Sequence, residues 1–144
     1  MFSILKDIQT TFIHSPTVYK NLIPEDTILY RINQKIDFSF VNEACSNLYS
    51  HDKGRPVKNT PERMFRSLIV QYLNDFSDRQ MEHSARFDII TKWFIGIPIE
   101  DRSYDRRALG DFRDRLGEER WKLIDGDNLT IQLSHPSFFC LFFD

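Results

Sequence analysis

The residues whose types and spacing could carry chemistry are basic, and the first group surrounds a loop broken by Gly54 and Pro56. The loop leads into a helix start, and Glu62 is the single carboxylate between residues 53 and 66. Backbone amides and cations in this arrangement can lie along a phosphate backbone. A solvated surface loop explains the same residues equally well. Of the five basic residues, which include Arg66, the candidate phosphate contacts are Lys53, Arg55, Lys58 and Arg63.

The second basic group lies in the segment DRRALGDFRDRL, residues 105–116. A helix can lie in the major groove of DNA, where arginine bonds guanine through two hydrogen bonds. Arg106 and Arg107, at the start of this segment, are the candidates for base contacts. Asp111 and Asp114 alternate with the arginines, and simple pairing on an exposed helix face is the stronger interpretation of the pattern alone. The two candidates for phosphate contacts here are Arg113 and Arg115.

Residues suited to catalysis or metal binding do not cluster in this sequence. The four histidines are scattered, the two cysteines are far apart, and the adjacent acids Glu100 and Asp101 would point in different directions on a helix. No phosphate-binding loop, nucleophile elbow or dinucleotide-binding glycine pattern occurs. We therefore expect no catalytic residue, no metal ligand and no cofactor.

The composition limits the class of protein. A chain of 144 residues with 41% apolar residues is sufficient for one domain with a core. The formal net charge of −2 excludes a uniformly basic nucleic-acid binder but allows a local basic face. Two widely spaced cysteines, no signal peptide and no apolar run of membrane-spanning length predict a cytoplasmic protein without membrane contacts.

The segments that must position these residues are predicted to be helices. Thr60 is a helix cap and Pro61 suits the first helical position. Apolar residues then recur at helical spacing as far as Phe76, which predicts the central helix of the core. Ser77 and Gln80 match a capping box and predict that another helix begins directly afterwards.

Weaker helix signals lie in the N-terminal half of the chain. Residues 2–12 carry a short apolar pattern typical of a brief helix. Proline and two acids at residues 24–26 suit a helix start, and apolar residues follow at helical spacing over 28–36. A further short helix is predicted within residues 38–48.

Two helices are expected in the C-terminal half. Asp88 can cap the segment IITKWFIG, which Gly96 would end. Segments 77–88 and 105–116 are compatible with a helix-turn-helix-like arrangement. The apolar stripe of the last helix is formed by Leu109, Phe112 and Leu116. With strand signals nearly absent, the predicted fold class is all-α, a compact bundle of short helices with a helix-turn-helix-like portion.

The predicted organisation has three parts. Residues 1–21 are a lead-in, residues 22–121 form the helical domain, and residues 122–144 form an aberrant tail. Helical periodicity stops near Trp121, and the chain ends in an aromatic cluster. A packed terminal strand is one explanation, and an out-of-frame ending of a longer protein is the favoured one.

Several motifs occur together in one order. They are GRP at residues 54–56, the junction QYL-x-x-x-SDR-x-x-E, the turn WF-x-G-I and the closing segment YDRRALGDFRDRL. With this set, the stretch from about Leu22 to Trp121 resembles the N-terminal region of bacterial insertion-sequence transposases. The resemblance is closest to the IS1182/IS5-type group, which begins with an InsH-like N-terminal domain.

The resemblance implies a helical domain that binds double-stranded DNA at the terminal repeats of the mobile element. In the family, a separate domain follows, whose Asp, Asp and Glu hold two divalent ions, usually Mg²⁺, for strand transfer. This chain is expected to stop before such a site, so we expect neither enzyme activity nor a cofactor. Where the family has DHST or DHSA, this chain has Asp105-Arg106-Arg107-Ala108, so capping falls to Asp105 or Ser103.

Three hypotheses about function follow. The first is a truncated transposase that binds element ends for DNA transposition. The second is an interaction module that pairs with full-length transposase, or with itself, and inhibits assembly through the helix at residues 64–76 or the aromatic tail. The third is an inert remnant of a mobile element.

Overall fold

The structure is a computed structural model that describes residues 15–46 and 59–123, and these residues form helices and no strands. This confirms the predicted all-α bundle. The helices are α2 (Ser15–Leu22), α3 (Ile28–Lys35), α4 (Ser39–Ala44), α5 (Pro61–Asn74), α6 (Asp78–Phe87), α7 (Ile89–Ile95) and α8 (Arg107–Leu123). None of the helices in these two ranges has the length and apolar character that crossing a bilayer requires.

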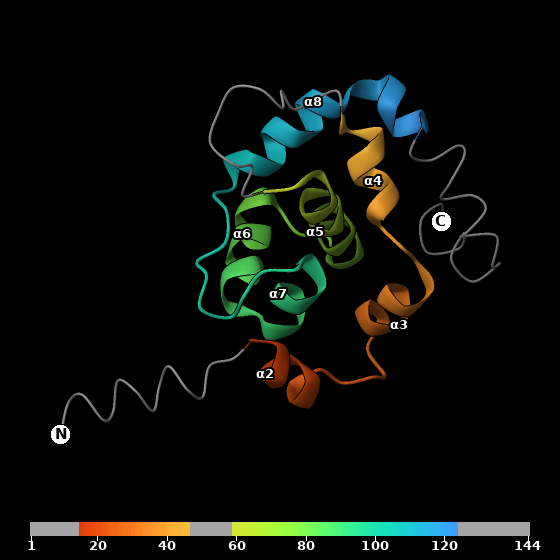
Figure 1. The fold of residues 1–144 in the computed structure, drawn as a ribbon. Helices are drawn as coiled ribbons and strands as arrows, with labels where there is room; N and C mark the ends of the chain where they lie inside the picture. Colours follow the sequence, from red (N-terminus) through yellow and green to blue (C-terminus); the bar gives the residue numbers. More distant parts are fainter. Residues whose placement is uncertain (1–14, 47–58, 124–144) are drawn as a thin grey trace.

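Helix α5 is the centre of the bundle and packs against α4, α6, α7 and α8 (Figure 1). Its start is as predicted, because Pro61 opens the helix and the Thr60 hydroxyl accepts a hydrogen bond from the Arg63 amide at 3.2 Å. Its inward face is fully committed to the core, through Met64, Phe65, Ile69 and Val70. Tyr72 of the same helix is 52% exposed, and the partner contact that the interaction-module hypothesis assigns to residues 64–76 stays a prediction.

Helices α6 and α7 follow with the predicted caps. The Ser77 hydroxyl accepts from the Gln80 amide at 3.2 Å, and the Gln80 side chain accepts from the Ser77 amide at 2.8 Å, which completes the capping box. Asp88 caps α7, and Gly96 ends it in the left-handed conformation with φ of 76°. A buried hydrogen bond of 2.9 Å between the hydroxyls of Ser84 and Thr91 joins the two helices.

The N-terminal helices differ from the prediction in their bounds. Helix α3 begins at Ile28, because Thr27 caps it through a 3.4 Å bond from the Tyr30 amide, and Pro24 lies before it. Helix α4 lies within the range predicted for it. The pattern at residues 2–12 and the aromatic tail at 124–144 lie outside the described residues.

Helix α8 crosses one end of the bundle (Figure 1) and packs on α5 and α6. The predicted stripe is confirmed, since Leu109, Phe112 and Leu116 are each at most 2% exposed. The regular helix is interrupted at Gly117, whose φ of 60° and ψ of 165° are non-helical. The arginine-rich part of α8 is thus the first part, held on the core by its apolar stripe.

Candidate nucleic-acid interface

The start of α8 presents Arg106 and Arg107 to solvent. Asp105 caps the helix, because its carboxylate accepts a 2.8 Å hydrogen bond from the Arg107 amide. This is one of the two caps expected from the sequence, and Ser103 does not take that role. The exposed pair therefore lies at a capped helix N-terminus, where backbone amides add partial positive charge.

Arg113 contributes to the packing of the bundle. Its guanidinium donates to both carboxylate oxygens of Asp78, at 2.9 and 2.5 Å, and to the Gln71 side chain at 3.2 Å. It thus joins α8 to α5 and α6. The hydrogen bond from Arg113 holds the pKa of the Asp78 carboxyl below its usual value. The partner is a distant acid rather than Asp111 or Asp114, so Arg113 serves to hold helices together.

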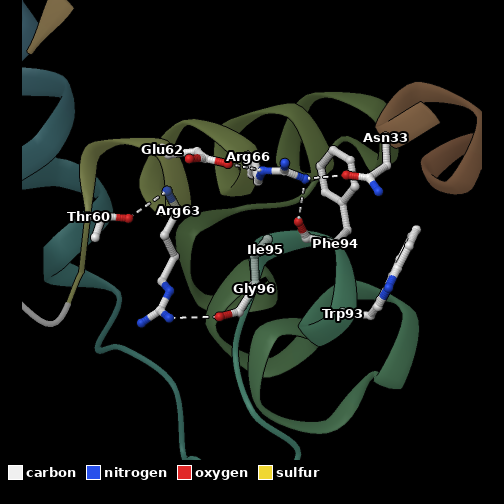
Figure 2. Close-up of a pocket in the computed structure, with 9 residues that line it drawn as sticks. All are labelled: Asn33, Thr60, Glu62, Arg63, Arg66, Trp93, Phe94, Ile95 and Gly96. Atoms are coloured by element: carbon white, nitrogen blue, oxygen red, sulfur yellow. Dashed lines mark hydrogen bonds and ion pairs between the residues drawn. The ribbon is translucent and has the colours of Figure 1, made fainter. Parts of the chain in front are cut away.

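Arg63 and Arg66 line a hollow of about 310 Å³ beside the start of α5 (Figure 2). The Arg63 guanidinium donates to the Gly96 carbonyl at 2.7 Å and so ties α5 to the end of α7. Arg66 donates to Glu62 at 3.0 Å, to Asn33 at 2.7 Å and to the Phe94 carbonyl at 2.9 Å. These bonds connect α5 to α3 and α7.

The Arg66 guanidinium lies in a largely buried environment between aromatic rings. Its guanidinium lies 4.4 Å from the ring centre of Phe38 and 5.2 Å from that of Phe94, at cation–π distance. Burial lowers the pKa of Arg66, and the neighbouring Glu62 carboxylate opposes this shift. Arg66 is a structural cation, although its sequence context is the same as that of the predicted phosphate contacts.

The connection between α7 and α8, residues 96–106, is held along its length by side chains of other elements. Lys92 is 5% exposed, and its ammonium donates to the Ile99 carbonyl at 3.2 Å and to the Asp101 carbonyl. Arg86 donates to the Arg102 carbonyl at 3.3 Å. Burial lowers the pKa of Lys92. These bonds hold the backbone of the connection that leads to Arg106.

The α2 helix holds the beginning of the same connection. The Tyr19 hydroxyl donates to the Ile97 carbonyl at 2.5 Å. Burial, together with the charge of Glu100, raises the pKa of Tyr19 to about 12, so the hydroxyl stays a donor near neutral pH. The connection is therefore anchored from Ile97 to Arg102.

Four exposed arginines lie on three adjoining elements, namely the first turn of α6, the anchored connection and the start of α8. Within residues 15–46 and 59–123, their side chains form no ion pair or hydrogen bond. The bonds from Arg86 to the connection and from Arg113 to Asp78 hold these elements together. We call this group the arginine edge, and it consists of Arg79, Arg102, Arg106 and Arg107.

The remaining residues that were predicted to contact DNA lie elsewhere in the chain. Lys53, Arg55 and Lys58 lie outside the described residues, and Arg115 is exposed on α8. Arg79, Arg102 and Lys92 were not among the residues that the sequence pattern indicated. The placement of Arg79 two residues after the capping Ser77 was a usable signal for an exposed first-turn residue. The burial of Lys92 was signalled only by its apolar neighbours in KWFIGI.

In the described part of the chain, no three His, Cys, Asp or Glu side chains come together in a group that could hold a metal ion.

Comparison with known families gives one match. Residues 17–115 match the family model described as "Transposase domain (DUF772)". No curated protein and no solved structure matches the chain. The match agrees with the transposase resemblance, and the assignment to the IS1182/IS5-type group stays a prediction.

Proposed function

The chain belongs to the transposase domain family (DUF772), and on this premise we propose that it binds double-stranded DNA at the ends of a mobile element. A transposase must locate the ends of its element before any strand can be cut. A compact helical domain with a local cationic surface suits this task, because phosphate contacts supply most of the affinity for DNA.

The observation that carries the proposal is the arginine edge. Its four guanidiniums are exposed, and the described residues do not neutralise them. Arginine binds phosphate through a planar fork of donors, which gives both charge and orientation. The capped N-terminus of α8 adds a partial positive charge beside Arg106 and Arg107. The formal net charge of −2 is compatible with this proposal, because the positive charge is local.

A titration of the full chain with fluorescent duplexes tests the proposal. The duplexes carry the ends of the parent element or the same bases in shuffled order. We expect tighter binding to the element ends, and affinity that falls steeply between about 50 and 200 mM salt. Binding that is absent, or that does not change with salt, would refute the proposal.

A pair of matched variants assigns the contacts. Arg106→Ala/Arg107→Ala removes two charges from the arginine edge. We expect the slope of log affinity against log salt to become shallower by about two, one for each lost phosphate contact. The control is Lys20→Ala/Lys35→Ala, which removes two exposed charges from α2 and α3, away from α8 (Figure 1). The control should keep the wild-type slope.

A further inference from the structure

Helices α5 and α6 are joined by a tight turn. Helix α5 ends at Asn74 and α6 begins at Asp78, so only Asp75, Phe76 and Ser77 lie between them. Asp75 adopts the left-handed conformation with φ of 53°, and the Phe76 amide bonds back to the Gln71 carbonyl at 2.9 Å. Two packed helices joined by a turn of this length form the unit whose second helix can lie in the major groove of DNA.

The two faces of α6 differ in chemistry. Met81 and Ala85 are fully buried and fix the helix on the core. Arg79 and His83 are exposed and four residues apart, which places them on one face of the helix. Phe87, one turn further, is 68% exposed and its ring centre lies 4.8 Å from that of His83. The outward face of α6 thus carries a cation, an imidazole and an apolar ring in succession.

The partners of these side chains show which groups can contact DNA bases. Arg79 has no side-chain partner among the described residues. The carbonyl of the Gln80 side chain is used by the capping box, whereas its amide group has no such role. Arg86 is engaged by Glu82 and by the Arg102 carbonyl, each at 3.3 Å. Arg79 is therefore the arginine on α6 with the most freedom to bond a base edge.

The exposed aromatic side of α6 suits the same ligand. A hollow of about 570 Å³ lies along this side and includes Phe76, His83, Phe87 and Ile89. The major groove presents the methyl group of thymine as its apolar feature, beside the donors and acceptors of the other base edges. Cations on the elements next to α6 are complementary to the phosphates that border the groove.

The bond from Arg113 removes an electrostatic obstacle. Asp78 lies in the first turn of α6, next to Arg79, where an unpaired carboxylate would repel phosphates. The bidentate contact with Arg113, at 2.9 and 2.5 Å, neutralises it from the protein side. Helix α8 therefore supports α6 from behind and offers Arg106 and Arg107 at its start.

We propose that α6 is the helix that enters the major groove and that Arg79 and His83 determine which bases are preferred. In this arrangement Arg106 and Arg107 contact phosphates beside the groove. The inference rests on the proposed function, because it assigns roles within the same DNA-binding surface. The sequence pattern assigned base recognition to the start of α8, whereas this inference assigns it to the outward face of α6.

Selection from a pool of random duplexes with the full chain tests the assignment. The wild-type chain should recover a consensus sequence. Arg79→Ala and His83→Ala should each lose the preference at particular base pairs, with discrimination falling about tenfold at those positions. Arg106→Ala/Arg107→Ala should keep the wild-type consensus and bind every sequence more weakly. Lys35→Ala, at an exposed position of α3, is the control with one charge removed.

The outcomes separate the two proposals. If Arg79→Ala and His83→Ala both recover the wild-type consensus, α6 is not the reading helix, while DNA binding itself stands. A consensus altered only in the Arg106→Ala/Arg107→Ala protein would assign base recognition to α8. If the wild-type chain binds no duplex at all, the proposed function fails. Thermal unfolding followed by circular dichroism establishes that each variant is folded.

Discussion

At the scale of single residues, Arg66 shows that a basic side chain in a basic stretch can take part in the packing between helices. Its guanidinium bonds three partners on three helices and lies over two aromatic rings. Lysine has the same charge but no planar fork, so it cannot reproduce these bonds together. The role of Arg66 thus depends on geometry, and charge alone does not supply it.

We therefore expect Arg66→Lys to lower the free energy of unfolding by about 2 kcal/mol, since it leaves partly buried acceptors unsatisfied. Urea denaturation measures this change. Arg31→Lys, at an exposed position of α3, is the matched control and should stay within about 0.5 kcal/mol of wild type. Equal stability of the two variants would contradict the structural role of Arg66.

The pair of Asp78 and Arg113 gives a prediction about pH. The pKa of Asp78 is lowered in the folded protein, first because Arg113 donates to its carboxylate. A carboxyl with a lowered folded pKa stabilises the fold above its unfolded pKa of about 3.9 and loses this contribution as pH falls through the folded value. The pair is partly exposed, with side-chain exposures of 37% and 36%, so its contribution is modest.

Arg113→Ala should cost about 1 kcal/mol of unfolding free energy at pH 7. The difference from wild type should shrink as pH falls below about 4, because protonated Asp78 no longer attracts the arginine. Urea denaturation of both proteins at pH 7 and at pH 3 gives the comparison. In an Asp78→Asn background, the effect of pH on this difference should be lost. A difference that is the same at both pH values would show that Arg113 acts by packing alone.

At the scale of elements, Gly96 ends α7 and begins the connection that carries part of the arginine edge. Its φ of 76° is in the left-handed region, and no atom lies within 4 Å of the position that a Cβ would occupy. A side chain at residue 96 would therefore strain the backbone, but it would not clash with neighbouring residues. Gly96→Ala should destabilise the fold by about 1–2 kcal/mol.

Asparagine tolerates this conformation better than alanine, so Gly96→Asn should cost less than Gly96→Ala. Thermal unfolding of the three proteins under one condition provides the test. If alanine and asparagine cost the same, the conformation at residue 96 is not the cause of the loss.

Helix ends were the best predicted elements because local chemistry decides them. Thr60, Ser77 and Asp88 each accept bonds from amides two or three residues ahead, so a short window of sequence contains the whole interaction. The start of α3 was misplaced because Pro24 is also a plausible helix start, and only the structure shows that Thr27 makes the capping bond.

The candidate site was less predictable because it depends on distant contacts. Arg113 and Asp78 are 35 residues apart, and no local pattern reveals that they meet. The sequence could identify arginines as candidates, but it could not separate those that hold helices together from those left exposed. Arg66 and Arg106 look alike in sequence and have opposite environments in the fold.

At the scale of the whole molecule, a protein with a formal charge of −2 keeps a cationic surface because many of its acids have structural roles. Asp88 and Asp105 cap helices, and Glu62, Asp78 and Glu82 pair with arginines of the bundle. The arginines of the edge have no such partners among the described residues. Net charge is thus a poor guide to the local field that DNA would meet.

Helices α3 to α8 contribute residues to one buried core, and this gives a prediction about cooperativity. Ile32 of α3 and Leu109 of α8 lie in the same buried cluster, in helices that lie apart around α5 (Figure 1). Ile32→Val should lower the unfolding free energy by about 1 kcal/mol and Leu109→Ala by about 2–5 kcal/mol. In a single cooperative unit, either change destabilises all helices together.

Urea denaturation followed by two probes tests this cooperativity. Tryptophan fluorescence in a Trp121→Phe background reports on Trp93, which stacks on Tyr30 at 5.7 Å and so senses the contact between α3 and α7. Far-ultraviolet circular dichroism reports on all helices. The two transitions should coincide in each variant, with an unchanged dependence on urea. Separate transitions in Leu109→Ala would mean that α8 unfolds independently of the rest of the core.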